Sequence, residues 1–218
     1  MSLATIHANL RAAFREKLLT LTDIDHSPGV SVTLANGVFT RASGSWLDAG
    51  FCPGQEVTVE GFTGSPLYGV VDTVSALALK LGVAGAQTVT GGGQFKVTLP
   101  QGRAWEGFDF FPIDGRPYVA ESVRAGPSRL ETITNPSGVG VAQHNVEASA
   151  TFFYPKRGTI AVERMVGALM TLLAQSPRRL AYAGDAGVIQ RVERSALYED
   201  GARLGCAVTA SILAFTTS

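Results

Sequence analysis

The first segment of the chain carries apolar residues at intervals of three and four, while most charged residues lie elsewhere around the helical wheel. The apolar positions are Ile6, Leu10, Ala13, Phe14, Leu18 and Leu21. This spacing predicts an amphipathic helix. We expect it to end between Asp23 and Pro28, because a proline clashes with the preceding helical turn and Gly29 favours a following turn.

From residue 28 to 98 the pattern changes to short β-branched or alternating runs separated by turn residues. Strands are expected at residues 30–34, 38–41, 56–60, 68–74, 76–81 and 94–98. Asn36-Gly37 supplies the positive φ angles of a two-residue hairpin loop, and Pro53-Gly54 suits a type II turn. The pattern predicts a small all-β barrel or sandwich domain, with Trp46 and Phe51 in its core.

After Pro100 the chain returns to longer elements, with strands expected at residues 105–111, 118–124, 146–152, 188–194 and 204–212. Thr159 is expected to cap a second helix, which Ser176-Pro177 ends. The apolar stripe of this helix is formed by Ala161, Met165, Ala168, Leu169 and Leu172.

The order helix, strands, helix, strands favours an α+β fold over a parallel α/β fold, which would need a helix between successive strands. We expect an antiparallel mixed-order sheet packed by two helices, with an inserted small all-β barrel or sandwich domain. Residues 1–25 and 99–218 would form the α+β domain, and residues 26–98 the insert. The first helix should pack beside the second on the sheet, because alone it would expose its apolar stripe.

Composition narrows the function classes. Eighteen basic residues balance eighteen acidic ones, so no long-range positive field favours binding to nucleic acid or to a membrane. Cys52 and Cys206 have no companion Cys or His at ligand spacing, which predicts two buried thiols rather than a zinc site or a disulfide framework. No leader and no apolar run of about 18 residues is present, so a cytoplasmic protein at synthesis is expected.

Candidate catalytic groups do not combine into a site. No nucleophile accompanies His7, His26 or His144, and His26 is expected to lie in a solvated linker. Glycine-rich stretches at residues 91–93 and 137–140 precede strands and lack the lysine of a phosphate-binding loop, so no nucleotide site is expected. The scattered carboxylates Asp109, Asp114, Glu121 and Glu131 leave a glycosidase-like pair open. We predict no catalytic residue, no cofactor and no metal, and hence a protein that is not an enzyme.

The aromatic run at residues 105–111 has two further interpretations besides sheet core. It could form a stacking platform for sugars or bases. Alternatively, residues on its outer face, Phe108 in particular, could contact another subunit, since aromatic side chains are enriched in interfaces.

From Trp105 onward several motifs follow one another in a particular order: Trp105-Glu106, Phe111-Pro112, Pro117-Tyr118-Val119, a strand that ends with residues 151–155, Gly158-Thr159 entering a helix, and Tyr198 before a last strand. In the order of these motifs the chain resembles the tail terminator-like proteins of long-tailed (siphovirus-type) phages. The insert is similar to small β modules of phage virion proteins in Phe39-Thr40, Ser43-Gly44-Ser45-Trp46, Gly50-Phe51, Pro53-Gly54-Gln55 and Val57-Thr58-Val59. Compact members of the family lack residues 28–98.

The resemblance implies a virion structural protein that forms a ring, usually a hexamer, at the head-proximal end of the tail. Such a ring caps the tail tube, stops its polymerisation and performs head–tail joining, after assembly in the bacterial host cytoplasm. The implied partners are further copies of the chain, the tail tube protein and the head–tail connector protein, with DNA passing through the ring. The alternatives are a tail tube or head-completion subunit, and a carbohydrate-binding or adhesive module that acts through the insert.

Long loops in such rings reach neighbouring subunits or line the channel. Residues 132–143 are the candidate here, and we expect them to be mobile before assembly. The residues proposed for the subunit interface or channel are Asn135, Pro136, Gly138, Gly140, Gln143 and Phe108.

Overall fold

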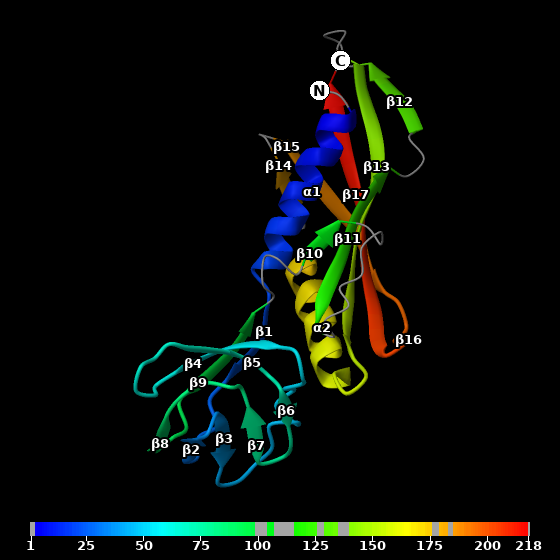
Figure 1. Cartoon of the computed structure of the whole chain (residues 1–218). Helices are drawn as coiled ribbons and strands as arrows, with labels where there is room; N and C mark the ends of the chain where they lie inside the picture. Colours follow the sequence, from blue (N-terminus) through cyan, green and yellow to red (C-terminus); the bar gives the residue numbers. More distant parts are fainter. Residues whose placement is uncertain are drawn as a thin grey trace.

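The described part of the chain consists of two helices and a series of mostly antiparallel strands, which form an α+β fold (Figure 1). The structure is a computed structural model that describes residues 3–98, 104–106, 116–125, 129–134, 140–175, 179–182 and 185–217. Its strands form three sheets, of four, five and eight strands. Among the described strand pairs, β10 and β11 run parallel and the others antiparallel.

Helix α1 (Leu3–Leu19) has the predicted amphipathic pattern. The apolar stripe is confirmed: Ile6, Leu10, Phe14, Leu18 and Leu21 are all buried, and Ala13 is partly buried. The predicted end was wrong, because the helix stops at Leu19 and residues Thr22–His26 form strand β1. The proline and glycine that suggested the end lie beyond that strand. His26 is therefore part of a sheet and not of a solvated linker.

Residues 22–98 form what we call the β region. Its first sheet has the order β1-β9-β4-β5, and its second has the order β6-β7-β3-β2-β8. Besides β1, the strands are β2 (Val32–Ala35), β3 (Val38–Arg41), β4 (Glu56–Glu60), β5 (Leu67–Val70), β6 (Thr73–Val74), β7 (Ala78–Lys80), β8 (Ala86–Val89) and β9 (Gln94–Thr98). The sequence indicated β2, β3, β4, β7 and β9, but the single strand predicted over residues 68–74 was wrong, because β5 and β6 are two strands in different sheets. Strands β1 and β8 were not predicted, since they lack a clear alternation.

The two sheets of the β region share a hydrophobic core of their own, separate from the core around the helices. Trp46 is completely buried at its centre, as predicted, with its ring 4.7 Å from that of Phe95 and 5.4 Å from that of Phe51. Edge-to-face contacts of this kind add to the stabilisation that burial of the rings provides.

Both predicted turns of the β region are present. Asn36 and Gly37 have φ angles of 51° and 77° and join β2 to β3, with Ala35 paired to Val38. This is the backbone of a two-residue hairpin loop with positive φ at both positions. Gly54 has a φ of 86°, as the predicted type II turn requires.

Gly93 and Gly91 provide a matched pair for testing the turn before β9. Both have positive φ, but a Cβ at Gly93 would lie 2.5 Å from the backbone oxygen of Glu60, whereas a Cβ at Gly91 would meet nothing within 4 Å. We expect Gly91→Ala to lower the free energy of unfolding by about 1 kcal/mol, the cost of left-handed backbone. Gly93→Ala should cost about 1 to 2 kcal/mol more, because the Glu60 carbonyl is fixed in β4. Urea denaturation of both variants measures the difference, and equal losses would contradict the steric explanation.

The large sheet has the order β10-β11-β13-β17-β15-β14, with β12 paired to β13 and β16 paired to β17. Its strands are β10 (Ala104–Glu106), β11 (Tyr118–Ala125), β12 (Arg129–Thr134), β13 (Gly140–Pro155), β14 (Arg179–Tyr182), β15 (Asp185–Arg194), β16 (Tyr198–Asp200) and β17 (Arg203–Thr217). The longest strands, β13 and β17, lie side by side, in register from Val141 opposite Thr217 to Pro155 opposite Arg203. Together with α1 and α2 (Thr159–Ala174), this sheet forms the helix–sheet region.

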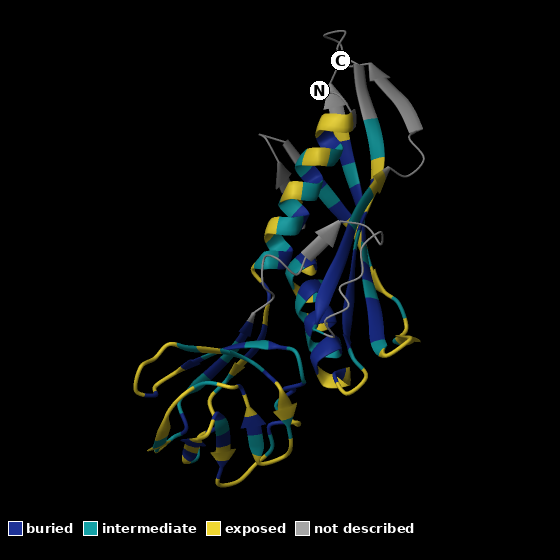
Figure 2. Ribbon diagram, viewed as in Figure 1, coloured by how far each residue is buried: buried dark blue, intermediate teal, exposed yellow. Residues whose placement is uncertain are grey.

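Both helices bury their apolar faces in one core on the same face of the large sheet (Figure 2). In α2, Ala161, Met165 and Leu169 are fully buried, as predicted, and Val162, Val166 and Leu173 are buried beside them. Thr159 is not the cap of this helix, because Gly158 occupies the N-cap position and no side chain caps it. A Cβ at Gly158 would lie 3.0 Å from the Cβ of Tyr154, so close packing favours glycine there over a capping residue.

Candidate functional site

Of the six residues proposed from the sequence for an interface or channel, the structure describes two. Asn135, Pro136, Gly138 and Phe108 lie outside the described residues. Gly140 and Gln143 are in strand β13 and not in a loop, which corrects the predicted extent of the loop. These residues are in a strand because the backbone of β13 pairs with β12 on one side and with β17 on the other.

In that pairing, Gln143 lies opposite Phe215 of β17 and Arg129 of β12, and Gly140 lies opposite Thr134. Residues 132–134 are likewise part of β12. The predicted loop is thereby reduced to residues 135–139, between β12 and β13, and for these residues it remains a prediction from the sequence.

The first candidate surface is the face of the large sheet opposite the two described helices, which we call the open face. Alternate residues of β13 and β17 point into the helical core. The residues between them lie on the opposite face, where most are exposed or partly exposed but Thr151, Phe153 and Gly205 are buried. Across four strands, the pairing places Ser122, Ser149, Thr209 and Glu193 in one row. The hydroxyl groups of Ser122 and Ser149 are 2.8 Å apart and share a hydrogen bond.

The next row of this open face is charged. Arg124, Glu147, Ser211 and Arg191 follow one another across the same strands, and the first two and the last are exposed. Arg191 also pairs with Glu193. The open face therefore combines small hydroxyl side chains with charges of both signs.

An aromatic cluster forms the end of this face nearest β16. The rings of Tyr118 and Phe153 are stacked at 4.7 Å, and the guanidinium of Arg203 lies 4.7 Å from the centre of the Tyr118 ring. Tyr198 of β16 contacts Phe153 edge to face and is 41% exposed. A cation over an aromatic face is attracted by the electron density of the ring, so Arg203 stabilises the cluster.

A second candidate site lies where the β region meets the helix–sheet region. Arg164 of α2 donates a hydrogen bond from Nη2 to the backbone oxygen of Ala49 at 2.8 Å, and one from Nη1 to the backbone oxygen of Asp23 at 3.2 Å. One guanidinium thus holds two segments of the β region. A Cβ at Gly50 would lie 2.3 Å from Nη2, so the absence of a side chain there makes room for Arg164.

Asp23 is the centre of this junction and is almost completely buried. Its Oδ2 accepts hydrogen bonds from Nε2 of Gln55 at 2.7 Å and from the hydroxyl of Tyr154 at 3.1 Å. Among the residues that the structure describes, none forms a hydrogen bond with its Oδ1, and Nη1 of Arg164 lies 3.8 Å away. Gln55 in turn accepts a hydrogen bond from the backbone nitrogen of Cys52 at 2.8 Å.

Burial dominates the electrostatics of the junction. It raises the pKa of Asp23 from 3.8 to about 6, although Arg164 and the hydrogen bonds from Tyr154 and Gln55 favour the charged form. Burial, with the Asp23 charge adding to it, also raises the pKa of Tyr154 and of Cys52. Tyr154 and Cys52 therefore stay protonated at physiological pH.

His26 lies near the junction, against the core of the β region. Its ring contacts Trp46 and Phe51 edge to face, and Nη1 of the buried Arg41 donates to its Nε2 at 3.3 Å. Burial lowers the pKa of His26, and the charges of Arg41 and Arg164 lower it further. A neutral ring that accepts from arginine has a structural role in this arrangement.

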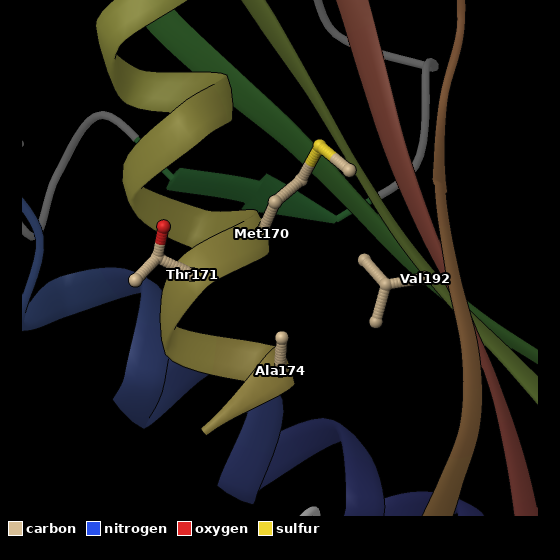
Figure 3. Close-up of a pocket in the computed structure, with 4 residues that line it drawn as sticks. All are labelled: Met170, Thr171, Ala174 and Val192. Atoms are coloured by element: carbon tan, nitrogen blue, oxygen red, sulfur yellow. The ribbon is translucent and has the colours of Figure 1, made fainter.

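A pocket of about 330 Å³ lies between the C-terminal half of α2 and β15 (Figure 3). The described residues that line it are Met170, Thr171, Ala174 and Val192. These side chains offer apolar groups and one hydroxyl, and the Thr171 hydroxyl already donates to the backbone oxygen of Gly167. The lining residues provide no acid–base pair or nucleophile–base pair for catalysis.

The aromatic residues of the β region bear on the carbohydrate alternative. Trp46, Phe51, Phe39, Phe62 and Phe95 are buried in its core, and Tyr68 is 71% exposed. A stacking platform needs exposed rings, so the motif residues Trp46 and Phe51 cannot form one in this fold.

Cys52 and Cys206 are both free and buried, as predicted from the sequence. Within the part of the chain that the structure describes, no three histidine, cysteine, aspartate or glutamate side chains are grouped to hold a metal ion. Of the two helices described, neither is long and apolar enough to span a membrane. No protein-family model matches the chain, and a search of curated proteins found no match.

Proposed function

We propose that this chain is a structural virion subunit of the tail-terminator type. It would form a closed ring at the head-proximal end of a phage tail tube, stop the growth of the tube and join it to the head connector. The order of elements from β10 onward agrees with the motif order on which the resemblance rests: strands, a helix after Gly158-Thr159, and a final long strand.

The observation that carries the proposal is the open face of the large sheet. An antiparallel sheet can bury one face and leave the other exposed to water. The open face carries the small side chains of Ser122, Ser149 and Thr209, which permit a second protein surface to approach closely. Its exposed charges have both signs, which suits contact with a second copy of the same chain. A head-to-tail contact that uses such a surface gives a ring when its rotation closes.

The position of the β region suits a ring in which this region lies on the outside. Its strands fill one end of the molecule, and β12 and the start of β13 lie at the opposite end (Figure 1). As an inserted domain with its own core, it would project from the ring without interrupting contacts made by the large sheet.

Light scattering and negative-stain microscopy of the purified chain test the proposal. We expect closed rings of about six copies of the 22.9 kDa chain. Open filaments would favour the tail tube alternative, since a rotation that does not close produces a helical array. A single chain at every concentration would contradict self-assembly, and a glycan array would then test the adhesive alternative through Tyr68.

The variant Ser149→Arg tests the open face directly. A long charged side chain at the centre of the row should prevent close approach and weaken assembly about tenfold or more. The matched control is Thr171→Arg on the exposed side of α2, which should leave assembly unchanged. Sedimentation velocity compares the two, and rings of Ser149→Arg as stable as those of the control would exclude this face as the contact.

A further inference from the structure

We propose that the junction between the β region and α2 is a pH-sensitive lock centred on Asp23, which holds the β region more firmly in mildly acidic than in neutral solution. The inference does not depend on the proposed function. It rests on the position of one buried carboxyl group at the contact between two hydrophobic cores.

The lock combines groups from both regions. Asp23 and Gln55 belong to the β region, whereas Tyr154 and Arg164 belong to the helix–sheet region. The Asp23 side chain is 1% exposed, and α2 contacts β1 along this side. Separation of the two regions would therefore return the Asp23 carboxyl group to water.

The pH dependence of the junction is set by Asp23 and by the titratable groups that surround it. Arg164 approaches from α2, Tyr154 from β13, Cys52 and Gln55 from the loop before β4, and His26 lies on the same strand. Arg164 remains charged, while Tyr154 and Cys52 remain neutral because their pKa values are raised. Asp23 and His26 are thus the groups of this set that titrate between about pH 4 and pH 7.

Proton linkage determines whether closure of the junction strengthens or weakens as the pH rises. With the junction closed, Asp23 keeps its proton up to about pH 6, whereas an exposed aspartate loses it near pH 3.8. Between these values the closed state binds more protons than the open state, so closure weakens as the pH rises from about 4 to about 6. The two pKa values differ by about two units, which corresponds to about a hundredfold change in the closing equilibrium between a pH well below both values and a pH well above both.

Two other contacts moderate the effect. The pKa of His26 is lowered in the folded chain, so its contribution has the opposite sign and is lost as the pH falls below about 6.5. The hydrogen bonds from Arg164 to the backbone oxygens of Ala49 and Asp23 do not depend on the carboxyl charge. The junction therefore loosens at neutral pH but does not release the β region.

Cys52 is a native reporter of the junction. Its thiol is buried with the core of the helix–sheet region, and a Cβ at Gly158 would lie 3.3 Å from its sulfur. Cys206, buried in β17, provides an internal reference for opening of the large sheet. A dipyridyl disulfide reagent labels thiols over this pH range, and its rate with an unfolded peptide at each pH corrects for thiolate content.

We expect the corrected labelling rate of Cys52 in the full chain to rise about thirtyfold between pH 4.5 and pH 7.5, without a matching rise at Cys206. Asp23→Asn, which is neutral at every pH, should keep Cys52 protected throughout. The matched control Asp25→Asn removes an exposed carboxylate two residues away and should retain the wild-type profile. His26→Gln should make the rise steeper.

Three results would overturn the lock. The first is equal protection of Cys52 at both pH values in the wild-type chain. The second is parallel labelling of Cys52 and Cys206, which would indicate opening of the whole molecule. The third is a pH profile that persists in Asp23→Asn. Should that variant fail to fold, the wild-type comparison of the two cysteines alone decides between these outcomes.

Discussion

Replacing Trp46 by alanine is expected to lower the free energy of unfolding of the β region by about 3 to 5 kcal/mol. The indole is fully buried, packs against Phe51 and Phe95, and lies 5.0 Å from the guanidinium of Arg41. Its removal leaves a cavity between two sheets, and a small β core has few other side chains that could fill it. Arg41 would also lose the aromatic face on which it rests.

Hydrogen exchange followed by mass spectrometry measures this effect by segment. Because the β region has its own core, amides in residues 22–98 should lose protection in Trp46→Ala while those of β13 and β17 keep theirs. The adjacent Leu47 is 39% exposed, so Leu47→Ala serves as the control and should change stability by less than about 0.5 kcal/mol. Equal loss of protection in both regions would show that the two cores unfold as one unit.

Replacing Phe14 by alanine should destabilise the helix–sheet region by a similar amount, about 3 to 5 kcal/mol. Phe14 is the largest side chain in the buried stripe of α1 and is fully enclosed. Amphipathic helices in proteins gain most of their stability from tertiary packing, so α1 depends on this packing against the large sheet.

Urea denaturation followed by circular dichroism measures the loss for Phe14→Ala. The exposed Glu16 on the same helix provides the control, and Glu16→Ala should stay within about 0.5 kcal/mol of the wild type. A loss below about 1 kcal/mol for Phe14→Ala would contradict the position of α1 in the core.

Much of the fold could be predicted because local pattern and burial coincide. The stripe of α1, the Asn36-Gly37 hairpin and the alternation of β13 each depend on residues close together in the chain. The end of α1 was misplaced because Thr22–His26 lacks regular alternation: Asp23 and Ile24 are both buried, and the pairing of β1 with β9 is irregular between Thr22 and Ile24. Periodicity does not reveal such a strand.

The junction could not be predicted for a different reason. Asp23, Gln55 and the pair Tyr154 and Arg164 come from three separate parts of the sequence, and each is an ordinary residue in its local sequence. Their chemistry arises only when the two regions meet and exclude water from the carboxyl group. The one local signal was an aspartate beside the apolar Ile24 in a segment otherwise interpreted as the end of a helix.

The paired strands β13 and β17 give the molecule a direction in which it resists force. Fifteen residue pairs connect them in unbroken register over about 50 Å. A pull along the strands loads all the hydrogen bonds of this ladder in shear, so they must fail together. A pull across the strands opens the pairs one after another and needs far less force. A force applied parallel to β13 and β17 would therefore act on the mechanically most resistant part of the fold.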